Sequence, residues 1–396
     1  MCLSICRTLT MKKSARNKSI AVFAERLYGG GVERILDTIL RHIDKQLISI
    51  TVYASHEEQE YIPIEGLEYK YYFETPLPND TDLTVLIKKS INKIKLFVYY
   101  HFSPRLFFLL FVRKKYDTTL AFIEGYATRI ASGAQKDTRK IAWVHADMKD
   151  YHWSSIAFQS FSEEKACYES FEKVVCVSQK VKAEMVDLFG IGMRTVVLYN
   201  PIDKEEILRK AAAQIEVKRP LKGRIKLLSV GSLIPVKGYN RLIDCIQNLY
   251  EDGLDLNLTI VGDGPEKLSL ENKIRLLSLE DRVLLTGFES NPYPYFANAD
   301  IFVCSSYAEG FSTVVTEALI MGLPIVATEC SGIREQLGNN QWGLITTNDD
   351  EALQAGICQL SSDRELRAQY SSRAKEAGQK YSLHENLKAI ESLLSL

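Results

Sequence analysis

The chain has 396 residues, which is too long for one ordinary hydrophobic core and favours two domains of about 200 residues each. Its composition, 46% hydrophobic and 25% charged, is typical of a soluble globular protein, and a net charge of -1 gives no electrostatic reason to expect a nucleic-acid partner. The eight cysteines are scattered without a CxxC pair, a pattern that favours reduced thiols in the cytoplasm over a disulfide framework or a zinc site.

Residues 1–18 are predicted to form a disordered lead. Their apolar run is too short for a signal peptide, and Met1 and Met11 are alternative starts of translation. No segment of the sequence contains the roughly 18 apolar residues that a membrane-spanning helix needs.

Apolar, β-rich runs alternate with helical patterns along most of the chain. Because strands that are apolar on both faces and alternate with helices form parallel sheets covered on both sides, the predicted fold class is α/β, with two tandem Rossmann-like doubly wound domains. The predicted strands of the first domain are 19–24, 47–54, 118–123, 140–145, 173–178 and 195–200, and those of the second are 225–231, 256–262, 282–288, 300–306 and 324–329.

The predicted N-terminal domain, 19–203, ends in the stretch "NPIDKEEI", where a proline stops the last strand and a charged segment begins. The C-terminal domain is predicted over 204–379, and a final amphipathic helix over 380–396 is placed so that it can pack back on the N-terminal domain. Ligands of such sheets bind at the carboxyl ends of the strands, so the cleft between the two domains is the expected site.

A glycine run follows the first predicted strand, in "ERLYGGGVERIL". Glycines let a backbone approach a phosphate closely, and a helix N-terminus offers unpaired N–H groups. However, the spacing is not GxGxxG, and no acid ends the second strand where a ribose-binding residue is needed. Taken alone, the run indicates a tight turn more often than a ligand contact.

Two other strand-to-helix turns lie in the second series. In "VGSLIPVKGYNRLI", Lys237 precedes Gly238, where its ammonium is able to meet a phosphate above the strand ends. An isolated lysine is more often a solvated surface charge. In "IVGDGPEK", a plain turn and a ligand contact are equally good interpretations.

The stretch "SSYAEGFSTVVTEALIMGLPIVAT" carries more information. Ser312 is the predicted N-cap of a helix, and the N–H groups of Gly310, Phe311 and Ser312 are able to hold an anion such as a diphosphate. Glu317, on the second turn, is able to accept two hydroxyls of a ribose.

The second acid of this stretch, Glu309, stands before the turn, where a group carried by the diphosphate is expected. An acid near a helix N-terminus often only favours the helix dipole. That simple explanation suffices for one glutamate but does not explain Glu309, Gly310 and Glu317 together at this spacing.

These motifs resemble those of the retaining glycosyltransferases of family four, which have the two-domain GT-B architecture. The family signature is E-x7-E, and "EGFSTVVTEALIMGLPIVAT" is similar to it. "GGGVER", "NPID", "GSLIPVKG", "VGDGPE" and "LTGF" also occur in the family's order, so the resemblance covers about residues 19 to 380.

The resemblance implies the roles of the site residues. Glu309 is expected to contact the hydroxyls of the donor sugar, Lys237 to neutralise the diphosphate, and His145 to face the reacting centre from the N-terminal domain. Read without the family, His145 ends an apolar strand and is more often a satisfied core residue. The donor-binding residues implied are Gly30, Gly31, Ser232, Gly262, Gly287, Phe288, Gly310, Phe311, Ser312 and Glu317, the last of them on the ribose.

One position departs from the family pattern. The family commonly has arginine where this chain has Ser232. A contact between a cation and a phosphate contributes about 1.5–3 kcal/mol of binding free energy. Because the arginine is absent, the charge of the diphosphate has to be shared by Lys237, backbone amides and any further cation.

The segment 88–115 contains eight Lys or Arg, no acid and seven aromatic residues. Such a segment is able to lie on an anionic membrane surface, with its apolar side chains inserted and its basic ones at the headgroups. An equally good interpretation is a partly buried helix pair of the N-terminal domain with solvated lysines.

The predicted function is metal-independent transfer of a sugar from a nucleotide diphosphate sugar to a glycan or lipid-linked acceptor. The family resemblance implies that the anomeric configuration is retained and that UDP is the carrier. Bacterial surface polysaccharide synthesis is the expected context, in the cytoplasm and peripherally at the inner face of the plasma membrane, with no cofactor and no nucleic acid. The alternatives are an epimerase or a phosphorylase of the same architecture, or a non-catalytic subunit that binds the donor.

Overall fold

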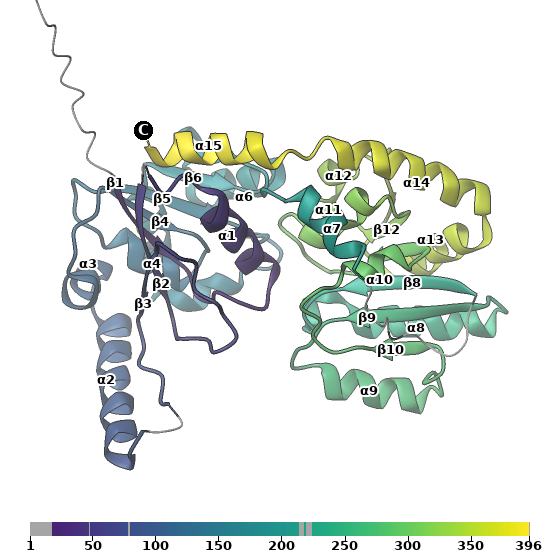
Figure 1. Ribbon diagram of the computed structural model, residues 1–396, viewed down its shortest axis with the longest axis horizontal. Helices are drawn as coiled ribbons and strands as arrows, with labels where there is room; N and C mark the ends of the chain where they lie inside the picture. The colour runs from purple at the N-terminus through teal and green to yellow at the C-terminus, as the bar shows by residue number, and fades with distance from the viewer. Residues whose placement is uncertain (1–17, 47, 78–79, 214–217, 219–223, 396) are drawn as a thin grey trace, which may run out of the picture.

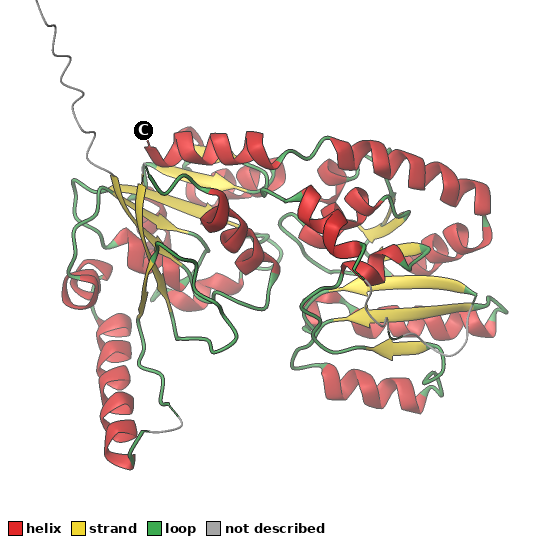
Figure 2. Ribbon diagram, in the orientation of Figure 1, coloured by secondary structure: helices red, strands yellow, loops and turns green. Residues whose placement is uncertain are grey.

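The computed structural model describes residues 18–46, 48–77, 80–213, 218 and 224–395. Apart from Lys18, the predicted disordered lead lies outside these residues. Two α/β units follow each other along the chain (Figure 1), and each consists of a sheet covered by helices (Figure 2).

The first sheet is entirely parallel and has the strand order β3-β2-β1-β4-β5-β6-β7. Its strands are β1 (Lys18–Phe23), β2 (Ile48–Ala54), β3 (Glu68–Tyr71), β4 (Thr118–Ala121), β5 (Arg139–Val144), β6 (Lys173–Cys176) and β7 (Thr195–Val197). The helices of this unit are α1 (Gly31–His42), α2 (Asp82–His101), α3 (Pro104–Phe107), α4 (Tyr126–Ser132), α5 (Phe161–Glu169) and α6 (Gln179–Phe189).

The second sheet, also parallel throughout, has the order β10-β9-β8-β11-β12-β13. Its strands are β8 (Ile225–Val230), β9 (Leu256–Val261), β10 (Val283–Leu285), β11 (Ile301–Cys304), β12 (Ile325–Thr328) and β13 (Leu344–Thr346). The helices are α7 (Lys204–Ala211), α8 (Tyr239–Glu251), α9 (Lys267–Leu276), α10 (Tyr293–Ala297), α11 (Thr313–Met321), α12 (Ile333–Gln336), α13 (Asp350–Ser362), α14 (Arg364–Gln379) and α15 (Leu383–Ser395).

Both strand orders contain the 3-2-1-4-5-6 succession of a doubly wound Rossmann domain. The central strands are buried on both faces, as in β9, where every residue of "LNLTIV" is buried. This burial explains why such strands are continuous apolar runs rather than alternating ones. The predicted fold class, two tandem Rossmann-like domains, is confirmed.

The sequence did not predict β3 and β13, which lie at the edges of the two sheets. The residues of β3, "EYKY", are charged or only partly buried, and β13 has three residues. An edge strand pairs on one side only and needs little apolar surface, so neither strand shows an apolar run.

The last helix, α15, leaves the second unit and lies on the first (Figure 1). Its residues Leu387, Ile390 and Leu394 belong to the buried core cluster that contains the first sheet. The backbone N–H of Asp44 donates to Glu391 Oε1 at 3.1 Å, and Arg139 donates to the carbonyl of Leu393. The first unit is therefore completed by residues from the far end of the described chain.

Helix α2 projects away from the first sheet (Figure 1). It begins at Asp82, where the side chain of Thr81 accepts the N–H of Thr84, and Tyr99 is its one buried residue. Among the described residues, no helix is both long enough and apolar enough to cross a bilayer.

Candidate active site

One cavity lies where the carboxyl ends of both sheets meet, with an empty volume of ≈ 990 Å³ that includes space open to solvent. The first unit contributes the loop after β1, the start of α1, the residue after β5 and the segment after β7. The second contributes the loops after β8, β9, β10 and β11. Loops at the carboxyl edge of parallel strands are where such folds bind ligands.

Most of the predicted site residues line this cavity: Glu309, His145, Lys237, Gly30, Gly31, Ser232, Gly262, Phe288, Phe311 and Ser312. Gly287, Gly310 and Glu317 lie outside its lining. Gly287 pairs with the neighbouring loop, since its carbonyl accepts the N–H of Gly262 at 3.0 Å. Ten of the predicted residues therefore line one cavity, and the other three lie outside its lining.

Lys237 is carried into the cavity by a short turn after β8. The next residue, Gly238, has φ +67°, and a Cβ there would come closer than 3.0 Å to the carbonyl of Ser305 in the loop after β11. Only glycine allows this approach. This close approach of the two loops places Lys237 Nζ 2.6 Å from Glu309 Oε1. The same oxygen accepts a hydrogen bond from the hydroxyl of Ser306 at 2.7 Å.

This ion pair sets the charge of Lys237. Burial alone would lower the pKa of Lys237, but the facing Glu309 carboxylate and its hydrogen bond raise the pKa above the usual value of a lysine. Lys237 is therefore a cation at any physiological pH, and a fixed positive charge at this edge attracts an anionic ligand.

His145 follows β5 and is almost completely buried. Its backbone N–H donates to Glu124 Oε2 at 2.9 Å, and the other oxygen of Glu124 accepts Trp153 Nε1 at 3.1 Å. Burial lowers the pKa of the imidazole to about 3, so the ring is neutral at physiological pH. Its Nε2 has no hydrogen-bond partner among the described residues.

Ser312 precedes α11, as predicted, but its side chain makes no N-cap hydrogen bond. The predicted N-cap position is therefore confirmed, although the hydroxyl accepts no capping hydrogen bond. That hydroxyl is buried and has no partner in the described part of the chain, while the carbonyl of Ser312 accepts Gln336 Nε2 at 2.6 Å. The amide Nε2 of Gln336 fixes the backbone at the start of α11 and leaves the hydroxyl available in the cavity wall.

Gly310 joins the two units. A Cβ on this residue would come closer than 3.0 Å to the carbonyl oxygen of His145, and its own carbonyl lies against the backbone of Gly332. Glycine is required here because two backbones from different domains meet at this point. The role of Gly310 in the structure is to let the domains approach.

A second contact between the units is made by Ser331. Its hydroxyl lies 2.5 Å from Asp147 Oδ2 and 2.9 Å from Glu184 Oε1, and both acids are buried. One hydroxyl proton serves only one of two carboxylates, so the second contact needs a protonated acid. Burial, together with the charge of Asp147, raises the pKa of Glu184 in agreement with this geometry.

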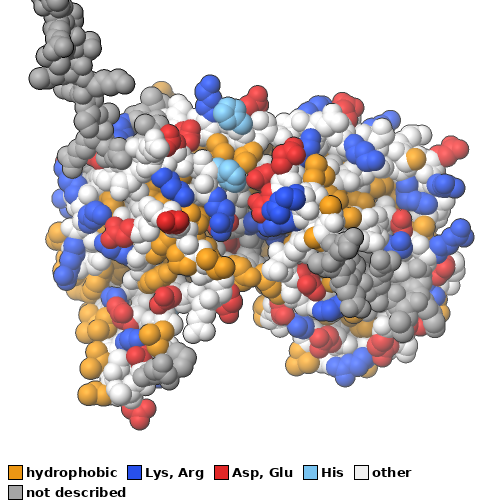
Figure 3. All heavy atoms as spheres, viewed as in Figure 1, with side chains coloured by type: hydrophobic (Ala, Val, Ile, Leu, Met, Phe, Trp, Pro, Cys, Tyr) orange, Lys and Arg blue, Asp and Glu red, His pale blue; other side chains and the backbone are white. Residues whose placement is uncertain are grey.

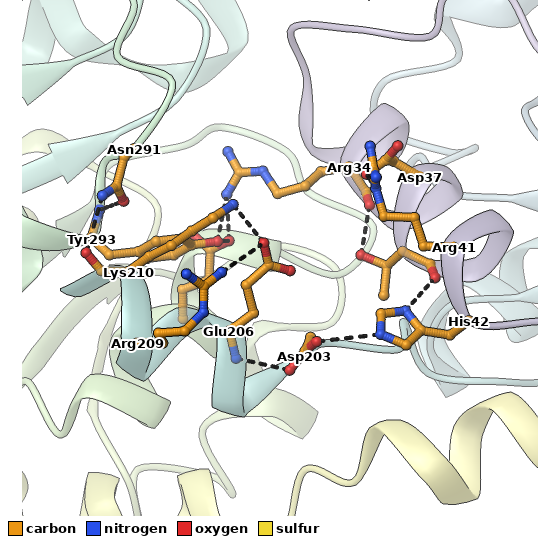
Figure 4. A network of polar contacts seen from close by, with 12 residues as sticks. Arg34, Asp37, Arg41, His42, Asp203, Glu206, Arg209, Lys210, Asn291 and Tyr293 are labelled. Carbon is orange, nitrogen blue, oxygen red and sulfur yellow. Dashed lines mark hydrogen bonds and ion pairs between the residues drawn. The ribbon is translucent and has the colours of Figure 1, made fainter. Parts of the chain in front are cut away.

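Glu317 lies behind the cavity wall, with its side chain 3% exposed. Its Oε1 accepts Arg34 Nη1 at 2.6 Å and the hydroxyl of Tyr293 at 3.2 Å (Figure 4). The contact with ribose that the family resemblance implies stays a prediction. In the structure Oε1 has protein partners, whereas Oε2 is buried and has no hydrogen-bond partner among the described residues.

Arg34 was not singled out from the sequence, although it stands in the quoted "GGGVER". It lies in the first turns of α1, lines the cavity and reaches Glu317 of the other unit. The Glu317 carboxylate raises the pKa of this guanidinium further above its usual value. The available signal was a basic residue three positions after a glycine run that follows a strand.

Two family models match the chain. The model described as "Glycosyltransferase Family 4" matches residues 29–206, and the model described as "Glycosyl transferases group 1" matches residues 211–377. The first match contains the glycine run and His145, and the second contains Lys237, Glu309 and Glu317.

Curated relatives extend over nearly the whole chain. An enzyme of Campylobacter jejuni, named N-acetylgalactosamine-N,N'-diacetylbacillosaminyl-diphospho-undecaprenol 4-alpha-N-acetylgalactosaminyltransferase, is 29% identical over 368 residues, which are 90% of this chain and 94% of that protein. The amylovoran biosynthesis glycosyltransferase AmsD of Erwinia amylovora is 22% identical over 350 residues, covering 87% of this chain and 90% of that protein.

Solved structures share the fold. Anabaena Alr3699/HepE, crystallised with UDP-glucose, is 20% identical with a TM-score of 0.72 and covers 96% of this chain and 100% of its own. The sucrose-phosphate synthase of Thermosynechococcus elongatus is 15% identical with a TM-score of 0.74, covering 96% and 98%. The matches to both family models, on either side of a cavity built as described above, show that this chain belongs to the family 4 glycosyltransferases.

Proposed function

We propose that this glycosyltransferase moves a sugar, with retention of its anomeric configuration, from a UDP-sugar to a hydroxyl of a glycan or lipid-linked acceptor. The observation that carries the proposal is the cavity at the carboxyl ends of both sheets, where Lys237 and the amides at the start of α11 favour a diphosphate. The Anabaena protein was crystallised with UDP-glucose, and the name of the Campylobacter jejuni relative specifies a diphospho-undecaprenol acceptor.

In the proposed reaction, the bond between the anomeric carbon and the diphosphate oxygen breaks while the acceptor oxygen bonds to that carbon on the same face. The acceptor's proton passes to the departing diphosphate oxygen. Lys237 and the α11 amides stabilise the negative charge that develops on the diphosphate. Neutral His145 accepts a hydroxyl of the sugar through Nε2, and Glu309 accepts another. No step of this reaction requires a metal ion or another cofactor.

The test is a binding and turnover panel. Purified protein is heated with uridine, UDP, GDP and their sugar derivatives, and is then incubated with each sugar nucleotide and a lipid-diphosphate glycan. UDP or a UDP-sugar at a hundred times its Kd is expected to stabilise the fold by about 2.7 kcal/mol. The expected products are free nucleotide and an extended, α-linked glycan. The rate of their formation is expected to be unchanged when EDTA is added.

The alternatives give different results in the same panel. A new epimer of the donor sugar would indicate an epimerase, and donor binding without turnover by any acceptor would indicate a non-catalytic subunit. The family descriptions and the relatives named above favour transfer. If none of the nucleotide diphosphates stabilises the fold, the proposed function as a whole is contradicted.

We further propose that helix α2 holds the enzyme on an anionic membrane at the inner face of the plasma membrane, in the cytoplasm. Leu83, Ile87, Ile94 and Phe97 follow one another at helical spacing and are 67, 50, 60 and 56% exposed. Figure 3 shows hydrophobic side chains along this projecting helix, with basic ones nearby. An exposed apolar stripe with lysines beside it is typical of helices that lie in a membrane interface.

The double variant Ile94→Ser/Phe97→Ser is expected to bind vesicles containing anionic lipid at least about tenfold more weakly than the wild type, because two inserted side chains are lost. Flotation of the protein with vesicles measures this. The matched control is Leu268→Ser/Leu276→Ser on α9, where two apolar residues are even more exposed, at 66 and 85%. An equal loss in the control, or no vesicle binding by the wild type, would exclude docking through α2.

A further inference from the structure

Lys237 alone does not balance the negative charges around the cavity. Its described lining contains three acids, Asp263, Glu289 and Glu309, and two cations, Lys237 and Arg34. Lys237 already faces Glu309 at 2.6 Å, and Ser232 stands where the resemblance led us to expect another cation. A donor diphosphate brings further negative charge into this site. The remaining cation of the described lining is Arg34.

Arg34 is held by one edge of its guanidinium only. Both of its hydrogen bonds come from Nη1, to Glu317 at 2.6 Å and to Tyr293 at 3.2 Å. Within the described chain, Nε and Nη2 have no partner, and the side chain is 41% exposed. Figure 4 shows the Arg34 guanidinium reaching out from α1, with one nitrogen at the dashed lines and another directed away from them. A planar fork with a free edge matches the geometry of a phosphate.

Glu317 explains how this arginine keeps its position. A carboxylate with 3% exposure is costly to bury without a cation, and Arg34 Nη1 supplies that cation. The hydroxyl of Tyr293 shares Glu317 Oε1 and also accepts from Arg34, so the guanidinium is fixed from two directions. A side chain as flexible as arginine would otherwise lose considerable freedom on binding a ligand.

The two ends of this arrangement belong to different domains. Arg34 lies on α1 of the N-terminal unit, whereas Glu317, Tyr293 and Lys237 belong to the C-terminal unit. A diphosphate between Arg34 and Lys237 would contact one cation from each domain. Binding of the donor is thereby linked to the approach of the domains.

Resting on the proposed function above, we propose that Arg34 is the second cation that binds the donor's diphosphate, and that Glu317 is a positioning residue which orients it. Arg34 replaces from the N-terminal domain the charge that is missing at Ser232. Glu317 acts through Arg34, and its Oε1 is occupied by that contact.

The test compares binding of UDP and of uridine by calorimetric titration, using uridine to displace UDP where its own heat is small. Arg34→Met is expected to weaken UDP binding by about tenfold to a hundredfold, the range for one cation-to-phosphate contact, and to leave uridine binding unchanged. The matched control is Arg41→Met, on the same helix but paired with Asp37 and outside the lining of the cavity. The control is expected to change neither affinity.

Arg34→Lys keeps the charge and the helix but loses the fork, so a smaller loss of UDP affinity, about threefold to tenfold, is expected. This variant serves if Arg34→Met does not fold. Glu317→Gln is expected to weaken UDP but not uridine binding, and to add nothing in the double variant with Arg34→Met. A ribose contact by Glu317 would instead weaken uridine binding and add to the effect of Arg34→Met.

If both Arg34 variants bind UDP with the affinity of the wild type, the inference about Arg34 is wrong. The proposed function remains intact in that case, provided that Lys237→Met still weakens UDP binding. Equal losses of UDP and uridine affinity in Arg34→Met would also overturn it, since that result indicates a disturbed pocket. If the wild type binds no nucleotide diphosphate, the proposed function itself fails. The two failures are thus separate.

Discussion

Lys237→Met is expected to lower kcat for sugar transfer by at least about a hundredfold, because it removes a cation that stabilises the departing diphosphate in a partly enclosed site. Glu309→Gln is expected to have an effect of similar size, because it removes both the acceptor for sugar hydroxyls and the carboxylate that holds Lys237 at 2.6 Å. The measurement is steady-state transfer with each purified variant under donor saturation.

Stability separates this catalytic effect from damage to the fold. Lys237→Met leaves the Glu309 carboxylate without its cation, which is expected to cost about 1–3 kcal/mol of unfolding free energy. The double variant Lys237→Met/Glu309→Gln should recover most of that stability without recovering activity. Lys273→Met, which breaks a pair with Asp244 at 2.6 Å, is the control and should keep full activity, because both residues lie outside the cavity lining. If the Lys237→Met variant keeps the kcat of the wild type, the role assigned to Lys237 in catalysis is wrong.

The second large effect is expected for Gly310→Ala, which adds one methyl group between two domains. The new Cβ would overlap the carbonyl oxygen of His145, and that backbone is held by the hydrogen bond from its N–H to Glu124. Neither side is able to yield, so the domains have to separate. Because a misplacement of about 1 Å costs about a hundredfold in rate, transfer is expected to fall by at least that factor.

Small-angle scattering of this variant should show a larger radius of gyration than the wild type. The control is Gly192→Ala, whose Cβ would meet only side-chain atoms of Val186 at ordinary contact distance. Normal activity and unchanged scattering in Gly310→Ala would show that the contact with His145 is not needed for closure.

The sequence was sufficient to predict most of the fold because buried parallel strands are long apolar runs separated by helices. It failed at β3 and β13, where an edge position demands little apolar surface. For segment 88–115 it left two interpretations open, because composition does not determine whether lysines face solvent or lipid. The structure shows that α2 is exposed, whereas Phe107 and Phe108, which follow it, are buried.

The candidate site was predictable as far as single loops encode it. The loops that carry Lys237 and Glu309 are continuous segments whose glycines and acids are visible in the sequence. The contact between Arg34 and Glu317 joins residues 283 positions apart in different domains, and no periodicity or local spacing reports such a pair. The contact between Gln336 Nε2 and the carbonyl of Ser312 likewise joins residues that are 24 positions apart, and no local spacing reports it.

Helix α15 has a consequence for how the protein is made. During synthesis, the first Rossmann unit emerges from the ribosome well before Leu387, Ile390 and Leu394, yet these three side chains are buried in the core cluster that contains its sheet and part of the second unit. The early unit therefore waits, with an apolar surface uncovered, until the entire second unit has been translated. Final consolidation of both halves becomes a single late event, in which the N-terminal unit is not finished before the C-terminal unit exists.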